Sequence, residues 1–193
     1  MPLEARVVIL LLHLVAMLFM SAPLYMLVIV NERARFAVPP GYNTDRYMEN
    51  IIKQQPIRCY AYLAVILITG VLLVWSRGWL WADWALIAKL VIFAVLLGLL
   101  SYVHLGIQPR IEQVLAGTNP GEQIPADKRP TLVKWRMLRK RLSATCLFLV
   151  LTSLVFGVKV SLAYSWWLSV IFVALAALYA WRAFRKPVSF GWF

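Results

Sequence analysis

Three ionisable side chains lie inside long apolar stretches of this sequence, namely His13, Lys89 and His104. Such side chains are costly at membrane depth, so each is a candidate functional group. Met17 and Met20 follow His13 at the i+4 and i+7 positions, which places an imidazole and two thioethers on one helical face. These ligands suit Cu(I), and they also occur as axial ligands of haem iron. The alternative, that the methionines only fill gaps between packed helices, stays open.

Lys89 has two interpretations. Its apolar stem can carry the ammonium to the membrane surface, where Asp83 is available as a partner. Alternatively, the side chain faces the bundle and holds an anion, such as a porphyrin propionate or a quinone oxygen. His104 likewise either joins Tyr102 and Arg110 in a hydrogen-bonded cluster or packs at the interface. The chain has no phosphate-binding loop, nucleophile elbow or Cys-x-x-Cys motif, which excludes most soluble enzyme chemistry.

The composition indicates the environment of these groups. The chain has 193 residues, of which 62% are hydrophobic and 15% charged, yet its net charge is +12 and its mean hydropathy is +0.75. A soluble domain of this length cannot bury so much apolar surface, and a disordered chain is excluded for the same reason. Nucleic-acid binding needs a groove-reading element that is not evident here. The sequence therefore predicts an integral membrane protein whose basic residues lie outside the hydrocarbon.

Five stretches are long and apolar enough to cross a membrane as helices, which need about 20 residues each. They are continuously apolar rather than alternating, which favours helices over a β-barrel. We therefore predict an all-α fold with one membrane domain, residues 1–193, and five transmembrane helices at about 7–30, 59–76, 82–107, 142–160 and 164–181. The first stretch is too long for the apolar core of a cleaved signal peptide, so we expect it to be retained.

The basic residues are unevenly distributed between the two sides of this arrangement. Sixteen of the twenty lie in the loops 31–58 and 108–141 or in the carboxyl-terminal tail, which all fall on one side. By the positive-inside rule this side is cytoplasmic, so the amino terminus is outside and the carboxyl terminus is cytoplasmic. Indoles prefer the membrane interface, and six of the nine tryptophans are expected at the outer one, namely Trp75, Trp79, Trp81, Trp84, Trp166 and Trp167.

The second cytoplasmic loop ends in a basic helical segment that Thr131 can cap. Anionic lipid headgroups attract such segments by about 1 kcal/mol for each basic residue. The side chains that we expect to face these headgroups are Lys134, Arg136, Arg139, Lys140 and Arg141. The first cytoplasmic loop carries both signs of charge, and it docks either on the second loop or on a neighbouring subunit.

The predicted spans also give the depth of each candidate group. At 1.5 Å per residue, His13 lies about 9 Å and Lys89 about 10 Å from the outer ends of their helices, so the two are level. His104 lies about 33 Å from the outer face on the same arithmetic. A haem held between the two histidines of one subunit is therefore excluded.

The residues around these positions resemble a known family. His13 near the outer start of the first span, the segment 68–73 (Ile-Thr-Gly-Val-Leu-Leu) in the second, and Trp84 with Ala88-Lys89-Leu90 in the third are similar to a haem-associated membrane family. This family includes the HemJ-type protoporphyrinogen oxidases and the copper-resistance CopD proteins, and the resemblance covers roughly residues 7–107. It implies a bacterial inner-membrane protein that binds haem b or another redox ligand in a membrane redox complex. It also implies that His13 and Lys89 are the functional positions, and that any activity is of the protoporphyrinogen oxidase type.

Two further functions stay open at this point. The chain could be a non-catalytic accessory subunit that packs against other membrane subunits and binds lipid. It could also be a copper-handling membrane protein that uses His13, Met17 and Met20 as ligands.

Overall fold

The computed structural model describes residues 2–31, 42–53, 55–78, 83–116, 118–119, 122–162 and 164–185. The elements of this part of the chain are helical, and in chain order they are α1 (Leu3–Asn31), α2 (Tyr42–Lys53), α3 (Gln55–Arg77), α4 (Trp84–Ser101), the π-helix η2 (Tyr102–Ile107), α5 (Gln108–Ala116), α6 (Arg129–Leu162) and α7 (Trp166–Arg185). Five helical segments of the described chain are long and apolar enough to cross a membrane, namely Leu3–Val28, Arg46–Ser76, Trp84–Ala116, Arg129–Leu162 and Trp166–Arg185. The prediction of an all-helical chain with five membrane-length helices is therefore confirmed, and its orientation in the membrane stays a prediction.

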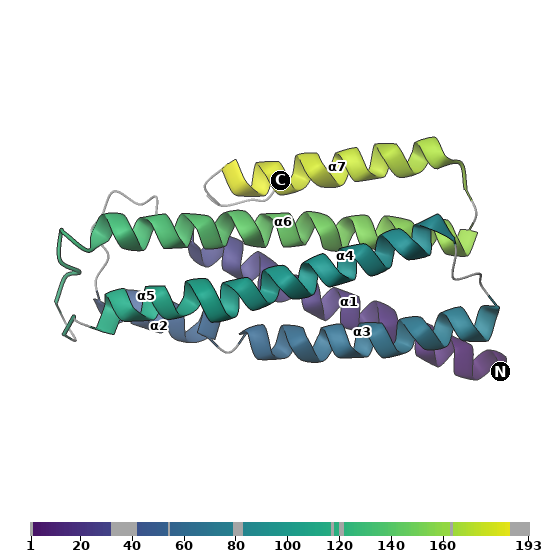
Figure 1. Cartoon of the computed structure of the whole chain (residues 1–193), viewed down its shortest axis with the longest axis horizontal. Helices are drawn as coiled ribbons and strands as arrows, with labels where there is room; N and C mark the ends of the chain where they lie inside the picture. The colour runs from purple at the N-terminus through teal and green to yellow at the C-terminus, as the bar shows by residue number, and fades with distance from the viewer. Residues whose placement is uncertain are drawn as a thin grey trace.

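Two of the helical segments are longer than a bilayer requires. The α6 helix has 34 residues, or about 50 Å at 1.5 Å per residue, against a hydrocarbon thickness of about 30 Å. The run from α4 through η2 to α5 has 33 residues. The extra turns of both lie beside α2, at the end of the bundle that we call the α2 end (Figure 1). The opposite end, where α1 begins, is called here the N-terminal end.

The long helices associate as pairs. The α3 helix packs along α1, and α4 packs along α6, whereas α3 and α4 contact each other at few positions. In Figure 1, α4 begins beside the end of α6 and runs obliquely toward α2, while α3 stays beside α1. The α7 helix packs on α6. The α1 helix also packs closely along α6, so the pairs α1·α3 and α4·α6 form two walls that touch along α1 and α6.

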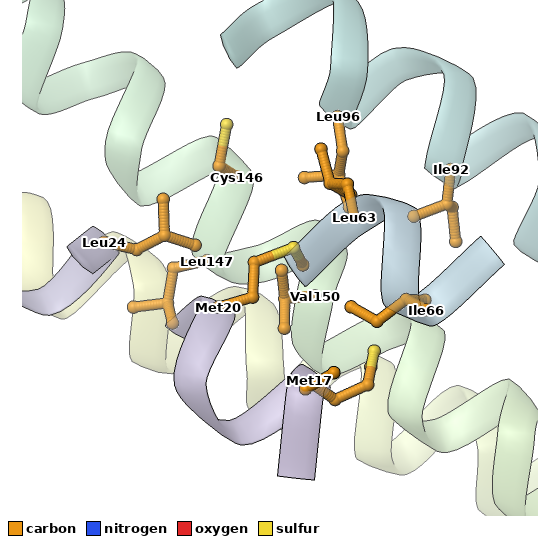
Figure 2. Close-up of a cluster of buried hydrophobic side chains, with 11 residues drawn as sticks. Met17, Met20, Leu24, Leu63, Ile66, Ile92, Leu96, Cys146, Leu147 and Val150 are labelled. Atoms are coloured by element: carbon orange, nitrogen blue, oxygen red, sulfur yellow. The ribbon is translucent and has the colours of Figure 1, made fainter. Parts of the chain in front are cut away.

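Apolar side chains from both walls meet in the middle of the bundle (Figure 2). This central cluster contains residues from each of the four helices, among them Met17, Met20, Leu63, Ile66, Ile92, Leu96, Cys146, Leu147 and Val150. A second cluster joins η2 and α5 to the start of α6, with Ile107, Ile111, Leu115 and Leu132 almost completely buried. Both sets of side chains are apolar, and between membrane helices such side chains associate through van der Waals packing rather than through the exclusion of water.

The tryptophans predicted for the outer interface gather at one end of the bundle as far as they are described. Trp75, Trp84, Trp166 and Trp167 are exposed, at the end of α3 and at the starts of α4 and α7. These three helix termini all lie at the N-terminal end (Figure 1). Trp79 and Trp81 lie outside the described residues.

The α2 end is held together by a buried ionic cluster. Glu49 of α2 is completely buried, and its carboxylate accepts hydrogen bonds from Arg139 at 2.7 Å and 3.0 Å and from Arg136 at 3.2 Å. Gln108, the first residue of α5, accepts a further hydrogen bond from Arg139 at 2.6 Å. Arg46 of α2 also forms an ion pair with Glu112 of α5. Of the two docking alternatives for the loop 31–58, the structure thus shows its segment α2 docked on the loop 108–141.

This cluster corrects the prediction for the basic segment of α6. Arg136, Arg139 and Lys140 do not face lipid headgroups, because all three are buried, the two arginines against Glu49 of α2. The ammonium of Lys140 lies 5.6 Å from the centre of the Phe184 ring. Lys134 and Arg141 are exposed on other faces of α6. The spacing of i, i+3 and i+4 places the three buried side chains on one side of the helix.

Candidate functional site

A cavity of about 360 Å³ lies between the two helix pairs, in the half of the bundle toward the N-terminal end. This volume falls in the range of pockets that bind small molecules, about 300–1,000 Å³. Its walls come from α1, α3, α4 and α6 and are apolar except for four polar side chains, His13, Lys89, Ser153 and Ser161. His13 and Lys89, for which the sequence predicts similar depths, both line this cavity.

His13 is held by the neighbouring helix of its own wall. Its side chain is buried, and its Nδ1 atom lies 2.8 Å from the hydroxyl oxygen of Thr69 on α3. The Thr69 hydroxyl donates its own hydrogen to the carbonyl of Val65, at 2.6 Å. With the Thr69 hydrogen directed to Val65, the Thr69 oxygen is the acceptor for a neutral His13 that carries its proton on Nδ1, and in this tautomer Nε2 has a lone pair. Histidines that bind metals are oriented in this way, with one ring nitrogen donating to the protein and the other available as a ligand.

Gly70 lies beside the imidazole on α3. A Cβ atom at this position would lie 3.4 Å from Cε1 of His13, which is an ordinary van der Waals contact. Thr69 and Gly70 are thus the residues of α3 that flank the ring, and the first supplies the hydrogen-bond acceptor. Both belong to the segment 68–73 on which the family resemblance rests.

Lys89 lies on the opposite wall and faces the cavity. Its Nζ atom approaches α6 so closely that a Cβ atom at Gly157 would lie 3.2 Å away. Asp83 is engaged elsewhere, because its side chain caps α4 by accepting a hydrogen bond from the backbone N–H of Ala85 at 2.8 Å. Among the described residues, no carboxylate lies within ion-pair distance of Lys89. The structure therefore agrees with the bundle-facing interpretation of Lys89 and not with a pair to Asp83.

Met17 and Met20 are buried and line the same cavity as His13. They also belong to the central apolar cluster, where Figure 2 shows Met20 beside Val150 of α6. The geometry is thus compatible with thioether ligands and with simple packing. In the described part of the chain, no group of three His, Cys, Asp or Glu side chains could hold a metal ion. A metal in this cavity would depend on His13 and thioether sulfurs.

His104 is remote from the cavity, as the sequence predicts. It lies in η2, and its ring packs edge-on against Tyr60 with the ring centres 6.2 Å apart. Arg110 lies over the ring of Trp135 at 4.6 Å, and Tyr102 is exposed. Within the described residues these side chains form no common hydrogen-bonded cluster, which favours the packing interpretation of His104.

The polar residues of α6 were missed by the sequence analysis. Ser153, Gly157 and Ser161 line the cavity at intervals of four residues. The available signal is a Ser-x3-Gly-x3-Ser pattern inside the fourth apolar stretch, where small polar residues are less conspicuous than charged ones. Their spacing places them on one helical face.

The electrostatic character of the cavity follows from this inventory. Lys89 is the one formally charged side chain among the residues that line it. Apolar walls screen a charge much less than water does, so an ammonium here attracts an acidic group strongly. The cavity can therefore hold a mainly apolar ligand that carries two polar parts. One is an atom that accepts the electron pair of His13, such as a metal ion, and the other is an acidic group that pairs with Lys89.

Comparisons with known proteins add no relative. No family model, no curated protein and no solved structure matches the chain. The resemblance to the HemJ/CopD family therefore stays a prediction that rests on the residues quoted for it.

Proposed function

We propose that this protein binds haem b, or a related redox ligand, in the cavity between its helix pairs. His13 would be the axial ligand through Nε2, and Lys89 would bind an acidic edge group such as a propionate. Bound haem b would supply one-electron redox chemistry. The observation that carries the proposal is the hydrogen bond from His13 Nδ1–H to Thr69, because it orients the imidazole and leaves Nε2 as a ligand.

The surroundings of His13 support this choice of ligand. The walls are apolar, and a porphyrin is a large apolar ring with two acidic side chains. An apolar shell also excludes water and influences the redox potential of a bound iron. The resemblance to the HemJ/CopD family is an independent argument, because it assigns function to the same two positions, His13 and Lys89.

We extend the proposal to the cellular context. The protein would lie in the bacterial cytoplasmic membrane, with its amino terminus outside, and act within a membrane redox complex. The distribution of basic residues supports this orientation. Lys134 and Arg141 remain the candidates for contact with anionic headgroups, because both side chains are exposed. Any enzymatic activity would be of the protoporphyrinogen oxidase type.

An absorption spectrum tests the haem proposal. We expect the protein purified from haem-supplied cells to show a Soret band that is lost in His13→Ala. The matched control is His104→Ala, which removes the only other histidine and should retain the band. A colourless wild-type protein, or equal bands in the two variants, would contradict the proposal.

Copper binding is the second candidate function, because Met17 and Met20 line the cavity together with His13. It predicts bound copper in the native preparation that is lost when both methionines are changed to leucine, a replacement that nearly conserves volume. Met26→Leu is the control, because Met26 is exposed on the same helix. Copper retained in the double variant would exclude this function.

The accessory-subunit alternative rests on the lipid-side faces of the helices. The α7 helix packs on α6 and exposes large apolar side chains, among them Val170, Phe172, Leu175 and Leu178. Lipid or another membrane subunit can cover such a face. This alternative predicts co-purification of a second subunit at fixed stoichiometry, and a monodisperse lone chain would argue against it.

A further inference from the structure

One wall of the cavity carries a polar strip that the binding of an axial ligand does not use. Ser153, Gly157 and Ser161 lie on the cavity side of α6, one helical turn apart. Lys89 reaches this strip from α4 at its middle residue, since its Nζ atom lies close to the α carbon of Gly157. The ammonium of Lys89 and the serine hydroxyls therefore lie close together on this wall, and Gly157 between the two serines has no side chain to separate them.

Gly157 lets the ammonium lie directly against α6. A Cβ atom on this residue would come within 3.2 Å of Nζ and 4.0 Å of Cε of Lys89. A contact of 3.2 Å would oblige the end of the lysine side chain to shift by a few tenths of an ångström. A side chain at position 157 would therefore move the ammonium slightly away from the hydroxyls of α6.

Ser153 provides a second polar group without a protein partner. It is only 9% exposed and lines the cavity. Among the described residues its hydroxyl forms no hydrogen bond, although serines elsewhere in α6 do, as Ser143 donates to the carbonyl of Arg139 at 2.8 Å. Unlike the Thr152 oxygen, which is fully enclosed without a partner in the described part of the chain, the Ser153 oxygen is accessible from the cavity that it lines. A ligand atom that accepts a hydrogen bond would satisfy it.

The chemistry of these groups defines the ligand group. An ammonium and a hydroxyl both donate hydrogen bonds, and together they suit an acceptor with negative charge. The rest of the cavity is apolar, so the body of the ligand must be apolar too. We propose that Lys89 and Ser153, with Gly157 as a positioning residue, form a subsite that binds the carboxylate of an otherwise apolar ligand. The subsite rests on the proposed function in taking a porphyrin propionate as this carboxylate.

The test compares two ligands that differ only at their propionates, haem b and its dimethyl ester, in which both carboxylates are converted to neutral methyl esters. The purified wild-type protein is titrated with each, and the ratio of the two dissociation constants is measured from the Soret band. We expect the acid to bind about tenfold more tightly than the ester, as for one charge-assisted interaction in an apolar site. Lys89→Met should reduce this ratio to about one.

Ser153→Ala and Gly157→Ala test the two other members of the subsite. Each should lower the preference for the acid, and neither should change it further in a Lys89→Met background, because both act on the same carboxylate. Gly98→Ala is the control for the glycine, since a Cβ atom there meets nothing within 4 Å. Thr152→Val is the control for the serine, since the Thr152 hydroxyl is buried on α6 but does not line the cavity.

The outcomes separate this inference from the proposed function. Equal binding of acid and ester to the wild type would overturn the subsite and the role proposed for Lys89, while haem binding through His13 stands. Unchanged preferences in both Ser153→Ala and Gly157→Ala would overturn the subsite alone. Failure of both haem forms to bind would remove the proposed function. The subsite is then tested with a fluorescent polyene fatty acid and its methyl ester, and equal binding of this pair would overturn it too. If Gly157→Ala fails to fold, the milder Ser153→Ala decides.

Discussion

Basic side chains lie inside the bundle at both ends, but their surroundings are opposite. At the α2 end, the buried Arg136 and Arg139 share the completely buried carboxylate of Glu49. At the N-terminal end, the partly buried Lys89 faces an apolar cavity in which the described residues include no carboxylate. The first set of charges has a carboxylate partner inside the chain, and the second has none among the described residues.

This difference separates a structural role from a binding role. A buried ion pair satisfied by hydrogen bonds orients the elements that carry it, here α2, α5 and α6. A cation without an internal counter-charge gains a partner only when a ligand supplies one, which marks it as a candidate functional group. Three substitutions test this comparison, and their expected effects decrease in the order given.

The largest effect is expected for Glu49→Gln. The substitution leaves two buried guanidinium groups without their counter-charge, and breaking a buried ion pair in this way costs about 3–5 kcal/mol. The free energy of unfolding of the detergent-solubilised protein should fall by this amount, as measured by circular dichroism. Glu122→Gln is the control, because Glu122 is exposed and should tolerate the change.

A triple variant refines this first prediction. Replacement of Glu49, Arg136 and Arg139 together by methionine removes all three charges, and such replacements are often neutral or stabilising. We therefore expect the triple variant to be more stable than Glu49→Gln. An unchanged unfolding free energy in Glu49→Gln would show that the cluster does not hold α2 in place.

An intermediate effect is expected for Thr69→Val. The variant removes the acceptor that orients His13, and loss of such an outer partner lowers the affinity for a metal centre about 10–100-fold. The measurement is a haem titration, in which Thr69→Ser should retain the wild-type affinity. Thr145→Val is the control, because its exposed hydroxyl bonds only to the carbonyl of Arg141. Equal affinities in Thr69→Val and wild type would mean that another group orients the imidazole.

The smallest effect on stability is expected for Lys89→Met. No ion pair is broken, and a charge leaves an apolar cavity, so the unfolding free energy should stay within about 1 kcal/mol of the wild-type value or rise. The same unfolding measurement applies, with Lys53→Met on an exposed position of α2 as control. A loss as large as that of Glu49→Gln would reveal an internal partner for Lys89 and end the contrast between the two regions.

Sequence patterns predicted the parts of the site that depend on single helices. The level of His13 and Lys89 follows from the helical rise counted from the end of each span, and it needs no knowledge of packing. The remoteness of His104 follows from the same count. Ser153 and Gly157 escaped notice because neither is unusual in an apolar helix, and they matter only where Lys89 approaches.

The basic segment of α6 shows why part of the prediction was wrong. A run of positive charge next to a membrane span is typical of headgroup contact, and Lys134 and Arg141 still fit that pattern. The partner of Arg139, however, is Glu49, which lies 90 residues away in the chain. No local pattern connects the two, so burial of the arginines could not be predicted from their own surroundings.

The sequence alone determined that the chain is helical, that five helices are long and apolar enough to span a membrane, and how deep each candidate group lies along its helix. These properties depend on the composition and the rise of each segment by itself. Only the tertiary structure decided which groups meet. The pairing of α1 with α3 and of α4 with α6 joins His13 to Thr69 and Lys89 to Gly157, and the docking of α2 places Glu49 between two arginines. The facing direction of a side chain depends on the helices that pack against its own, and packing is a property of the whole chain.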